Sequence, residues 1–153
     1  MPNYSYDVQV NLPIQHLWNF VHVMDNWAPL VPGYISHRRV NDSQSLWSFY
    51  TDIGVVKKKI ELQVDITEWS EPEKVAFKLT GINEKLSGSG YFSAATIDEK
   101  KVQMTGFLDL TAEGMMAKMA NSIMKSSLPE ITKELTEAVA AKAEDQLTHI
   151  QRK

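Results

Sequence analysis

The sequence predicts an α+β fold in which a curved, antiparallel sheet of seven strands is wrapped around a long C-terminal helix. Three observations support this prediction. Between residues 4 and 110, apolar and polar side chains alternate in short runs, which is typical of half-buried strands. A short amphipathic helix is expected after the first strand, and the apolar pattern changes to a helical period beyond Gly114. Each strand offers only one apolar face, so the long helix must cover that face.

The expected strands are joined by short turns of the kind found in antiparallel sheets. The clearest strand places Ile60, Leu62, Val64 and Ile66 on one face and polar residues on the other. Because the polar segments between the runs are short, the strands should form an antiparallel meander. The expected strands cover residues 4–11, 35–40, 46–53, 58–69, 75–79, 86–97 and 102–110.

Two helical segments are expected. Pro13 suits the first turn of a helix, and apolar residues then recur at helical spacing, which predicts a short helix over about residues 13–23. In the long helix, Pro129 predicts a kink or a break. The tail from about residue 148 is expected to fray. The apolar stripe of the long helix consists of Met115, Met116, Met119, Ile123, Met124, Leu128, Ile131, Leu135 and Val139.

Composition restricts the location and the partners of the chain. Its length predicts a single domain over residues 1–153. The chain has no cysteine, which excludes disulfides and thiolate chemistry and favours a reducing compartment. No apolar run is long enough to span a membrane and the N-terminus lacks a signal-peptide pattern, so we predict a cytoplasmic protein. The net charge of -3 gives no general attraction to nucleic acid, and no nucleic-acid partner is expected.

Three features of the sequence resemble a known family. They are "PIQHLWNFVHVMDNWAPLVPGY" at residues 13–34, "LTGINEKLSGSGYFSA" at residues 79–94, and Gly114 before the long helix. On these features the chain, from about residue 3 to about 145, resembles the helix-grip fold of the START-like (SRPBCC) superfamily, which includes polyketide cyclase/dehydrase-like proteins. It is most similar to the carbon monoxide dehydrogenase G-like branch. The resemblance implies a deep, mostly apolar cavity between the sheet and the helix.

Ionisable side chains give little support for metal binding or catalysis. His16 and His22 lie six positions apart on the short helix and point in different directions, so we predict no metal and no cofactor. In the clear strands the acidic residues fall on the polar face, which disfavours acid–base catalysis. If the protein is an enzyme, the candidates for a polar pair in the cavity are Asp25, Tyr34, Tyr50 and Asp52.

Apolar residues expected to face the cavity are the candidates for ligand binding. The methionines at the start of the long helix would form an adaptable wall, although ordinary core packing explains them equally well. The candidates are Trp27, Leu30, Val31, Trp47, Phe49, Leu62, Val64, Phe77, Leu79, Phe92, Met104, Leu108, Met115, Met116, Met119 and Ile123.

The segment "DNWAPLVPGY" at residues 25–34 is apolar for a connection and is expected to be stiff and non-helical, because it contains two prolines and a glycine. In the helix-grip architecture it lies at the open end of the cavity. Two interpretations stay open. The segment can be a lid, in which Trp27, Leu30 and Val31 close over a ligand, or it can simply plug the end of the core.

Two basic runs, at residues 37–39 and 57–59, offer a surface for partners. Such runs are mostly solvated faces or protection of strand edges. If they lie together near the cavity mouth, they would instead contact an acidic protein or anionic lipid headgroups. The residues concerned are Arg38, Arg39, Lys57, Lys58 and Lys59.

Three functions are consistent with these observations. The first is non-catalytic binding or carriage of a small hydrophobic molecule, such as a lipid, a quinone or a polyketide-like compound. The second is an enzyme of the cyclase, dehydratase or hydrolase kind that uses the same cavity. The third, implied by the resemblance to the carbon monoxide dehydrogenase G-like branch, is an accessory component of a membrane-associated oxidoreductase such as carbon monoxide dehydrogenase.

Overall fold

The computed structural model describes residues 3–53, 56–83, 85–114 and 117–151. Within these ranges, the side chains of residues 51–53, 56–58, 120, 123, 124 and 147–151 are not described. Two predicted ligand-binding residues, Met115 and Met116, therefore lie outside the described residues. The side chains of Asp52, Lys57, Lys58 and Ile123 lie outside them as well.

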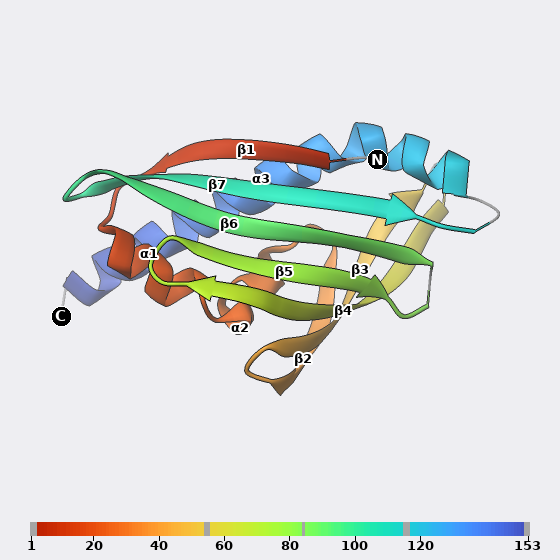
Figure 1. The fold of residues 1–153 in the computed structure, drawn as a ribbon, viewed down its shortest axis with the longest axis horizontal. Coiled ribbons are helices and arrows are strands. Elements are labelled where there is room, and N and C mark those ends of the chain that lie inside the picture. Colours follow the sequence, from red (N-terminus) through yellow and green to blue (C-terminus); the bar gives the residue numbers. More distant parts are fainter. Residues whose placement is uncertain (1–2, 54–55, 84, 115–116, 152–153) are drawn as a thin grey trace.

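The elements follow one another in the predicted order (Figure 1). β1 (Asn3–Val10) is followed by two short helices, α1 (Ile14–Val21) and α2 (Met24–Trp27), and by a 3-10 turn, η1 (Ala28–Leu30). A run of strands then leads to the long helix α3 (Ala117–Gln151). These strands are β2 (Tyr34–Asn41), β3 (Gln44–Ile53), β4 (Val56–Ser70), β5 (Lys74–Gly81), β6 (Leu86–Asp98) and β7 (Lys101–Ala112).

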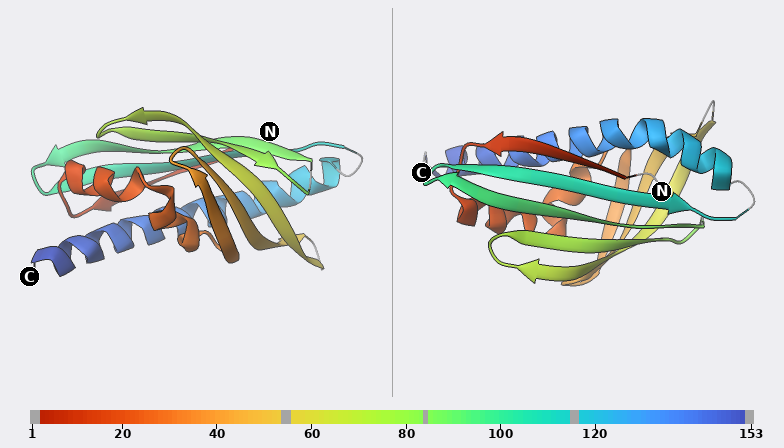
Figure 2. Two further views of the ribbon diagram at one scale, coloured as in Figure 1. Left: turned by 90° about the horizontal axis from the view of Figure 1, so that it is seen from below. Right: turned by 45° about the horizontal axis from the view of Figure 1, so that its top comes forward.

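The described strands form one seven-stranded sheet in the order β1-β7-β6-β5-β4-β3-β2. Every neighbouring pair is antiparallel, so β2 to β7 form a meander and β1 returns to pair with β7. The sheet curves around α3, which crosses its concave side, and α1 and α2 lie beside α3 towards its C-terminal end (Figure 2). The predicted helix-grip fold, with short helical segments between the first two strands, is confirmed.

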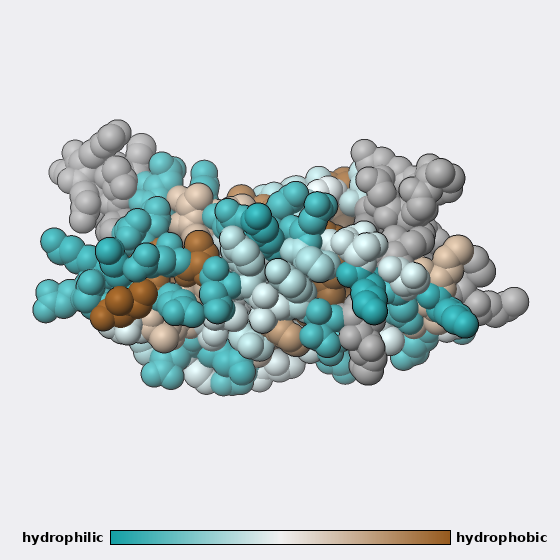
Figure 3. Space-filling view, turned by 90° about the horizontal axis from the view of Figure 1, so that it is seen from above, coloured by the Kyte–Doolittle hydropathy of each residue, from teal (hydrophilic) through white to brown (hydrophobic). Residues whose placement is uncertain are grey.

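The core lies between the concave face of the sheet and one face of α3. Val10, Val102 and Met104 from β1 and β7 are fully buried, as are Leu128 and Val139 from α3. Seen from above the view of Figure 1, the surface is mostly hydrophilic, with hydrophobic residues scattered over it (Figure 3). The long helix therefore covers the apolar face of the sheet, as the alternating pattern requires.

The segment predicted to be non-helical is largely helical. Met24–Trp27 forms α2, and Ala28–Leu30 forms η1. Pro29 lies in the first turn of η1, where a backbone N–H would have no partner within the helix, so proline breaks no hydrogen bond there. The prediction was wrong because it treated each proline as a helix breaker without regard to its position in a turn.

Pro129 lies inside α3 and does not split it. One turn further on, the Thr132 hydroxyl donates to the Leu128 carbonyl at 2.8 Å, and the Thr136 hydroxyl donates to the Thr132 carbonyl at 2.7 Å. Both threonines are buried, with 1% of each exposed. These bonds satisfy hydroxyl groups that would otherwise be unpaired against the sheet.

Gly33 controls the entry of the chain into β2. Its φ is +82°, and a Cβ atom there would lie 2.0 Å from the Tyr50 carbonyl oxygen. We expect Gly33→Ala to lower the free energy of unfolding by about 2–4 kcal/mol, because alanine meets both left-handed strain and this clash. Urea denaturation measures the loss. Gly114→Ala is the matched control, since its φ is +97° but the nearest atom to the new Cβ is 3.4 Å away. Equal losses in the two variants would contradict the role of the clash.

Candidate functional site

Four aromatic side chains meet on the concave face of the sheet. The ring of Trp27 from α2 lies 5.3 Å from that of Trp47 in β3, 5.3 Å from Phe77 in β5 and 5.0 Å from Phe92 in β6, measured between centroids. The contacts with Trp47 and Phe92 are edge-to-face, a favourable geometry for aromatic rings. We call these four side chains the aromatic cluster. All four are buried, so they form an apolar part of the core on this face.

Trp27 fills the core and does not cover it from outside. None of its surface is exposed (0%), and its indole N–H donates to the Val21 carbonyl at 2.9 Å. Leu30 and Val31 are partly buried against the same core. This packing of Trp27 agrees with the interpretation that the segment plugs the end of the core. Opening of the segment as a lid stays a prediction.

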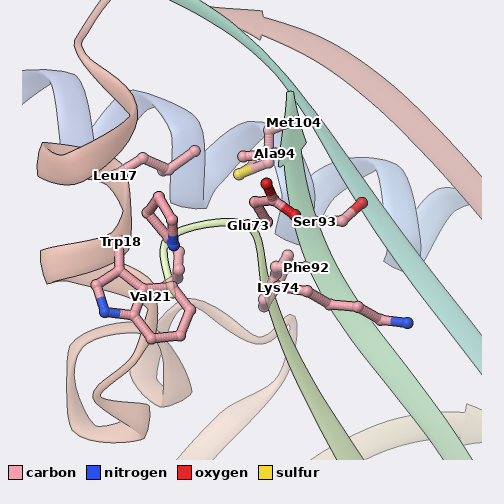
Figure 4. Close-up of a pocket in the computed structure, with 10 residues that line it drawn as sticks. Leu17, Trp18, Val21, Glu73, Lys74, Phe92, Ser93, Ala94 and Met104 are labelled. Carbon is pink, nitrogen blue, oxygen red and sulfur yellow. The ribbon is translucent and has the colours of Figure 1, made fainter. Parts of the chain in front are cut away.

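A hollow adjoins the aromatic cluster, between α1 and strands β5 to β7 (Figure 4). Leu17, Trp18 and Val21 line it from α1, and Phe92 and Met104 line it from the sheet. The volume open to the centre of a water molecule is about 10 Å³, which is room for about one water. A larger ligand would therefore enter the hollow only if these side chains moved apart.

A chain of three polar side chains lies where α2 meets β2. The Tyr34 hydroxyl is 2.7 Å from Nδ1 of His37, and Nε2 of His37 is 2.9 Å from Oδ1 of Asp25. An ionised carboxylate only accepts hydrogen bonds, so Nε2 carries a hydrogen and donates it to Asp25. In the neutral ring Nδ1 is then an acceptor, and the Tyr34 hydroxyl donates to it. We call Asp25, Tyr34 and His37 the polar triad.

A bulge in β2 brings two members of the triad to one face of the sheet. In a regular strand, residues three positions apart point to opposite faces. Tyr34 pairs with Phe49, and the register then shifts by one residue, so that His37 pairs with Trp47. Tyr34 and His37 therefore share the concave face with Phe49 and Trp47.

Of the four candidates for an enzyme, the structure brings two together, because Asp25 and Tyr34 both hydrogen-bond to His37. Tyr50 is 45% exposed, and the side chain of Asp52 lies outside the described residues. His37 was not selected as a candidate from the sequence, because it stands in a basic run and because the bulge in β2 does not alter the apolar pattern. The close spacing of Tyr34 and His37 was the one available signal.

Two buried polar atoms have no hydrogen-bond partner within the described part of the chain. They are Nε1 of Trp47 and Oδ1 of Asp109. Asp109 pairs with Ser89 of β6, away from the polar triad. Trp47 is 6% exposed and pairs with His37, so its unpaired N–H lies on the strand pair that carries the triad.

Most of the predicted ligand-binding residues lie inside the protein. Those that are buried are Trp27, Trp47, Leu62, Val64, Phe77, Leu79, Phe92, Met104 and Leu108. Leu30, Val31 and Phe49 are partly buried against the core. Met119 is 51% exposed, and a role for it in binding stays a prediction. The hollow is lined by eight residues that the prediction omitted. Three lie on α1, where helical spacing indicated only that they would be buried, and the eight are Leu17, Trp18, Val21, Pro72, Glu73, Lys74, Ser93 and Ala94.

The basic residues that are described do not form one unpaired patch. Arg39 forms an ion pair with Asp42, and Lys59 Nζ lies 3.8 Å from a Glu61 carboxylate oxygen. Among the described residues, no group of acidic and histidine side chains is arranged to hold a metal ion. No helix in the described ranges is long and apolar enough to cross a membrane.

Comparisons with known proteins identify the fold. A protein-family model described as "-like:-like" matches residues 1–153. No curated protein matches the sequence. Among solved structures, a conserved protein from Geobacillus kaustophilus has a TM-score of 0.79 at 12% identity, over 94% of this chain and 95% of that one.

Two further solved structures are similar to this chain over nearly its full length. The Zhui aromatase/cyclase from a Streptomyces species has a TM-score of 0.67 at 13% identity, over 95% of this chain and 94% of that one. A START superfamily protein from Mycobacterium smegmatis has a TM-score of 0.68 at 14% identity, over 94% of this chain and 98% of that one. At such low identity these similarities establish the architecture alone.

Proposed function

We propose a function for this chain from the premise that it belongs to the family matched over residues 1–153 and has the helix-grip fold of the START/polyketide cyclase superfamily. The protein binds or carries a small hydrophobic molecule, such as a lipid, a quinone or a polyketide-like compound, between the sheet and α3, and does not transform it. One observation carries the proposal. The aromatic cluster on the concave face adjoins a hollow whose walls are mainly apolar.

Binding to this surface requires local movement, the cost of which the burial of apolar ligand surface must offset. Burial of apolar ligand surface stabilises a complex by about 25 cal/mol per Å². A ligand that covers Phe92 and Met104 would displace Trp18 or Trp27, which lie on the short helices α1 and α2. Such short helices depend on packing for their stability, so their displacement costs less than movement of the sheet.

Fluorescence titration of delipidated protein with the neutral probe N-phenyl-1-naphthylamine tests the proposal. We expect saturable binding that other hydrophobic molecules displace. Phe92→Leu should weaken it about fivefold, equivalent to about 1 kcal/mol, because one aromatic contact is lost. Phe107→Leu is the matched control, since Phe107 stacks on Tyr91 at a centroid distance of 5.1 Å and its strand position places it on the opposite face from Met104. Absence of saturable binding in the unmodified protein would overturn the proposal.

A second candidate function is an enzyme of the cyclase, dehydratase or hydrolase kind. The polar triad favours it, since a tyrosine hydroxyl, an imidazole and a carboxylate in series can move a proton. Hydrolysis of 4-nitrophenyl butyrate tests the hydrolase form. A rate above buffer that falls at least about 100-fold in both Tyr34→Phe and His37→Gln would favour an enzyme over a carrier.

The hypothesis of an accessory role beside an oxidoreductase rests on the resemblance to the carbon monoxide dehydrogenase G-like branch. The cytoplasmic location also stays a prediction. Contact with an anionic membrane would use Arg38 and the basic run at residues 57–59. Co-sedimentation with phosphatidylserine vesicles at low salt tests this contact. Binding that disappears when residues 57–59 are changed to glutamine would support it, and no binding at low salt would end it.

A further inference from the structure

We propose that the concave face beside β2 recognises a hydroxyl group on the hydrophobic ligand, through the Tyr34 phenolic oxygen and the Trp47 indole N–H. This inference rests on the proposed function and specifies the chemistry of its ligand. It predicts that the protein selects hydroxylated apolar molecules over hydrocarbons of the same shape.

The polar triad fixes what Tyr34 offers to a ligand. When the His37 imidazole is neutral and its Nε2 hydrogen is donated to Asp25, the Tyr34 hydroxyl hydrogen is directed at Nδ1 of His37. Within the described residues the phenolic oxygen makes no other hydrogen bond. Its lone pairs therefore remain free to accept a hydrogen bond, while its own hydrogen is occupied.

Trp47 offers the complementary group. The indole N–H can only donate, it is buried, and the described residues provide no acceptor for it. Buried polar groups without partners are rare, and each one needs an explanation. An acceptor atom on a bound ligand would remove this unfavourable burial.

The strand register brings the two residues near one another on the same face of the sheet. Tyr34 pairs with Phe49 and Trp47 pairs with His37, so the two residues are diagonal neighbours across β2 and β3. Diagonal positions on one face lie about 7–8 Å apart, which is within the reach of aromatic side chains. On the next strand, Ile60 pairs with Phe49 and Leu62 pairs with Trp47, and both are buried, so the surroundings are apolar.

A hydroxyl group is the ligand group that fits both partners. Its oxygen accepts from the Trp47 N–H, and its hydrogen is donated to the Tyr34 oxygen. An ether oxygen satisfies only Trp47, and a hydrocarbon satisfies neither residue. Because Trp27 contacts Trp47 at a centroid distance of 5.3 Å, the same ligand would lie against the aromatic cluster.

The test compares three probes of nearly equal shape, 2-naphthol, 2-methoxynaphthalene and 2-methylnaphthalene, by competition against N-phenyl-1-naphthylamine. We expect 2-naphthol to bind most tightly, the methoxy compound less tightly and the hydrocarbon least. Tyr34→Phe should weaken 2-naphthol about five- to tenfold and leave the other two probes within about twofold, since it removes the oxygen that would accept from the ligand, together with the hydrogen bond to His37.

Two further variants make the result decisive. Tyr91→Phe is the matched control, because it removes a tyrosine hydroxyl from the ring that stacks on Phe107, outside the concave face, and should change no affinity. Trp47→Phe should remove the advantage of 2-methoxynaphthalene over 2-methylnaphthalene. Equal affinity of all three probes in the unmodified protein would overturn the inference and leave the proposed function intact. Failure of every probe to bind would instead overturn the proposed function.

Discussion

Replacement of Trp27 by alanine is expected to lower the free energy of unfolding by about 3–5 kcal/mol, because a fully buried indole is removed from the core. The side chain is 0% exposed, and it contacts three other aromatic rings. The variant also loses the hydrogen bond to the Val21 carbonyl, which stays buried. Urea denaturation at constant temperature measures the loss.

The same variant should gain a binding site for indole. An apolar cavity of this kind stays dry and accepts a small aromatic molecule of the missing shape. We expect added indole to raise the melting temperature of Trp27→Ala in a concentration-dependent manner and to leave the unmodified protein unchanged. The rescue would show that the space occupied by Trp27 can hold an aromatic ligand.

Trp69→Ala is the control for this prediction. Trp69 is 44% exposed and its indole N–H donates to the His22 carbonyl at 3.2 Å, so this variant should lose no more than about 1 kcal/mol. It should show no rescue by indole. If Trp27→Ala were as stable as Trp69→Ala, Trp27 would not be part of the core, and the plug interpretation would be wrong.

Gly106 of β7 lies directly against α3. An added side chain at this glycine should disturb the packing of α3 more than at any other glycine. A Cβ atom at this position would lie 2.0 Å from Oγ1 and 3.1 Å from Cβ of Thr136, which is itself buried. Gly106→Ala is therefore expected to lower the free energy of unfolding by about 1–3 kcal/mol, because β7 and α3 must separate to admit the methyl group. Gly106→Val should cost more.

A double-mutant cycle identifies the cause of that loss. Thr136→Ala alone removes a buried hydrogen bond to the Thr132 carbonyl and should cost about 1–2 kcal/mol. The double variant Gly106→Ala/Thr136→Ala should be more stable than the sum of the single losses predicts, by at least about 1 kcal/mol. Strict additivity would mean that the two residues do not meet, and that the helix does not pack against β7 at this point.

The sheet and the long helix were predictable because each depends on a pattern that burial imposes on the sequence. Ile60, Leu62 and Val64 alternate along β4, and such alternation requires one buried face. Short polar turns between the strands then leave the antiparallel meander as the natural topology. Trp47, Phe77 and Phe92, which were expected to face inward, are buried for the same reason.

The local structure of the site depends on features that leave weaker traces in a sequence. Pro29 interrupts an apolar segment, yet it lies in the first turn of η1, and its effect depends on its position in the turn. His37 reaches the concave face only because β2 holds one extra residue. Asp25 and Tyr34 could be selected as candidates one by one, whereas the histidine that connects them could not.

The central claim, that a hydrophobic ligand binds between the sheet and α3, is tested most directly by NMR spectroscopy of the methionine methyl groups during titration with N-phenyl-1-naphthylamine. Met104 lines the hollow and is 0% exposed, whereas Met119 is 51% exposed and reports on association with the surface. We expect the Met104 methyl resonance to shift and to saturate with one equivalent of probe. A saturable fluorescence response that leaves the Met104 resonance in place, or that shifts Met119 alone, would contradict this claim.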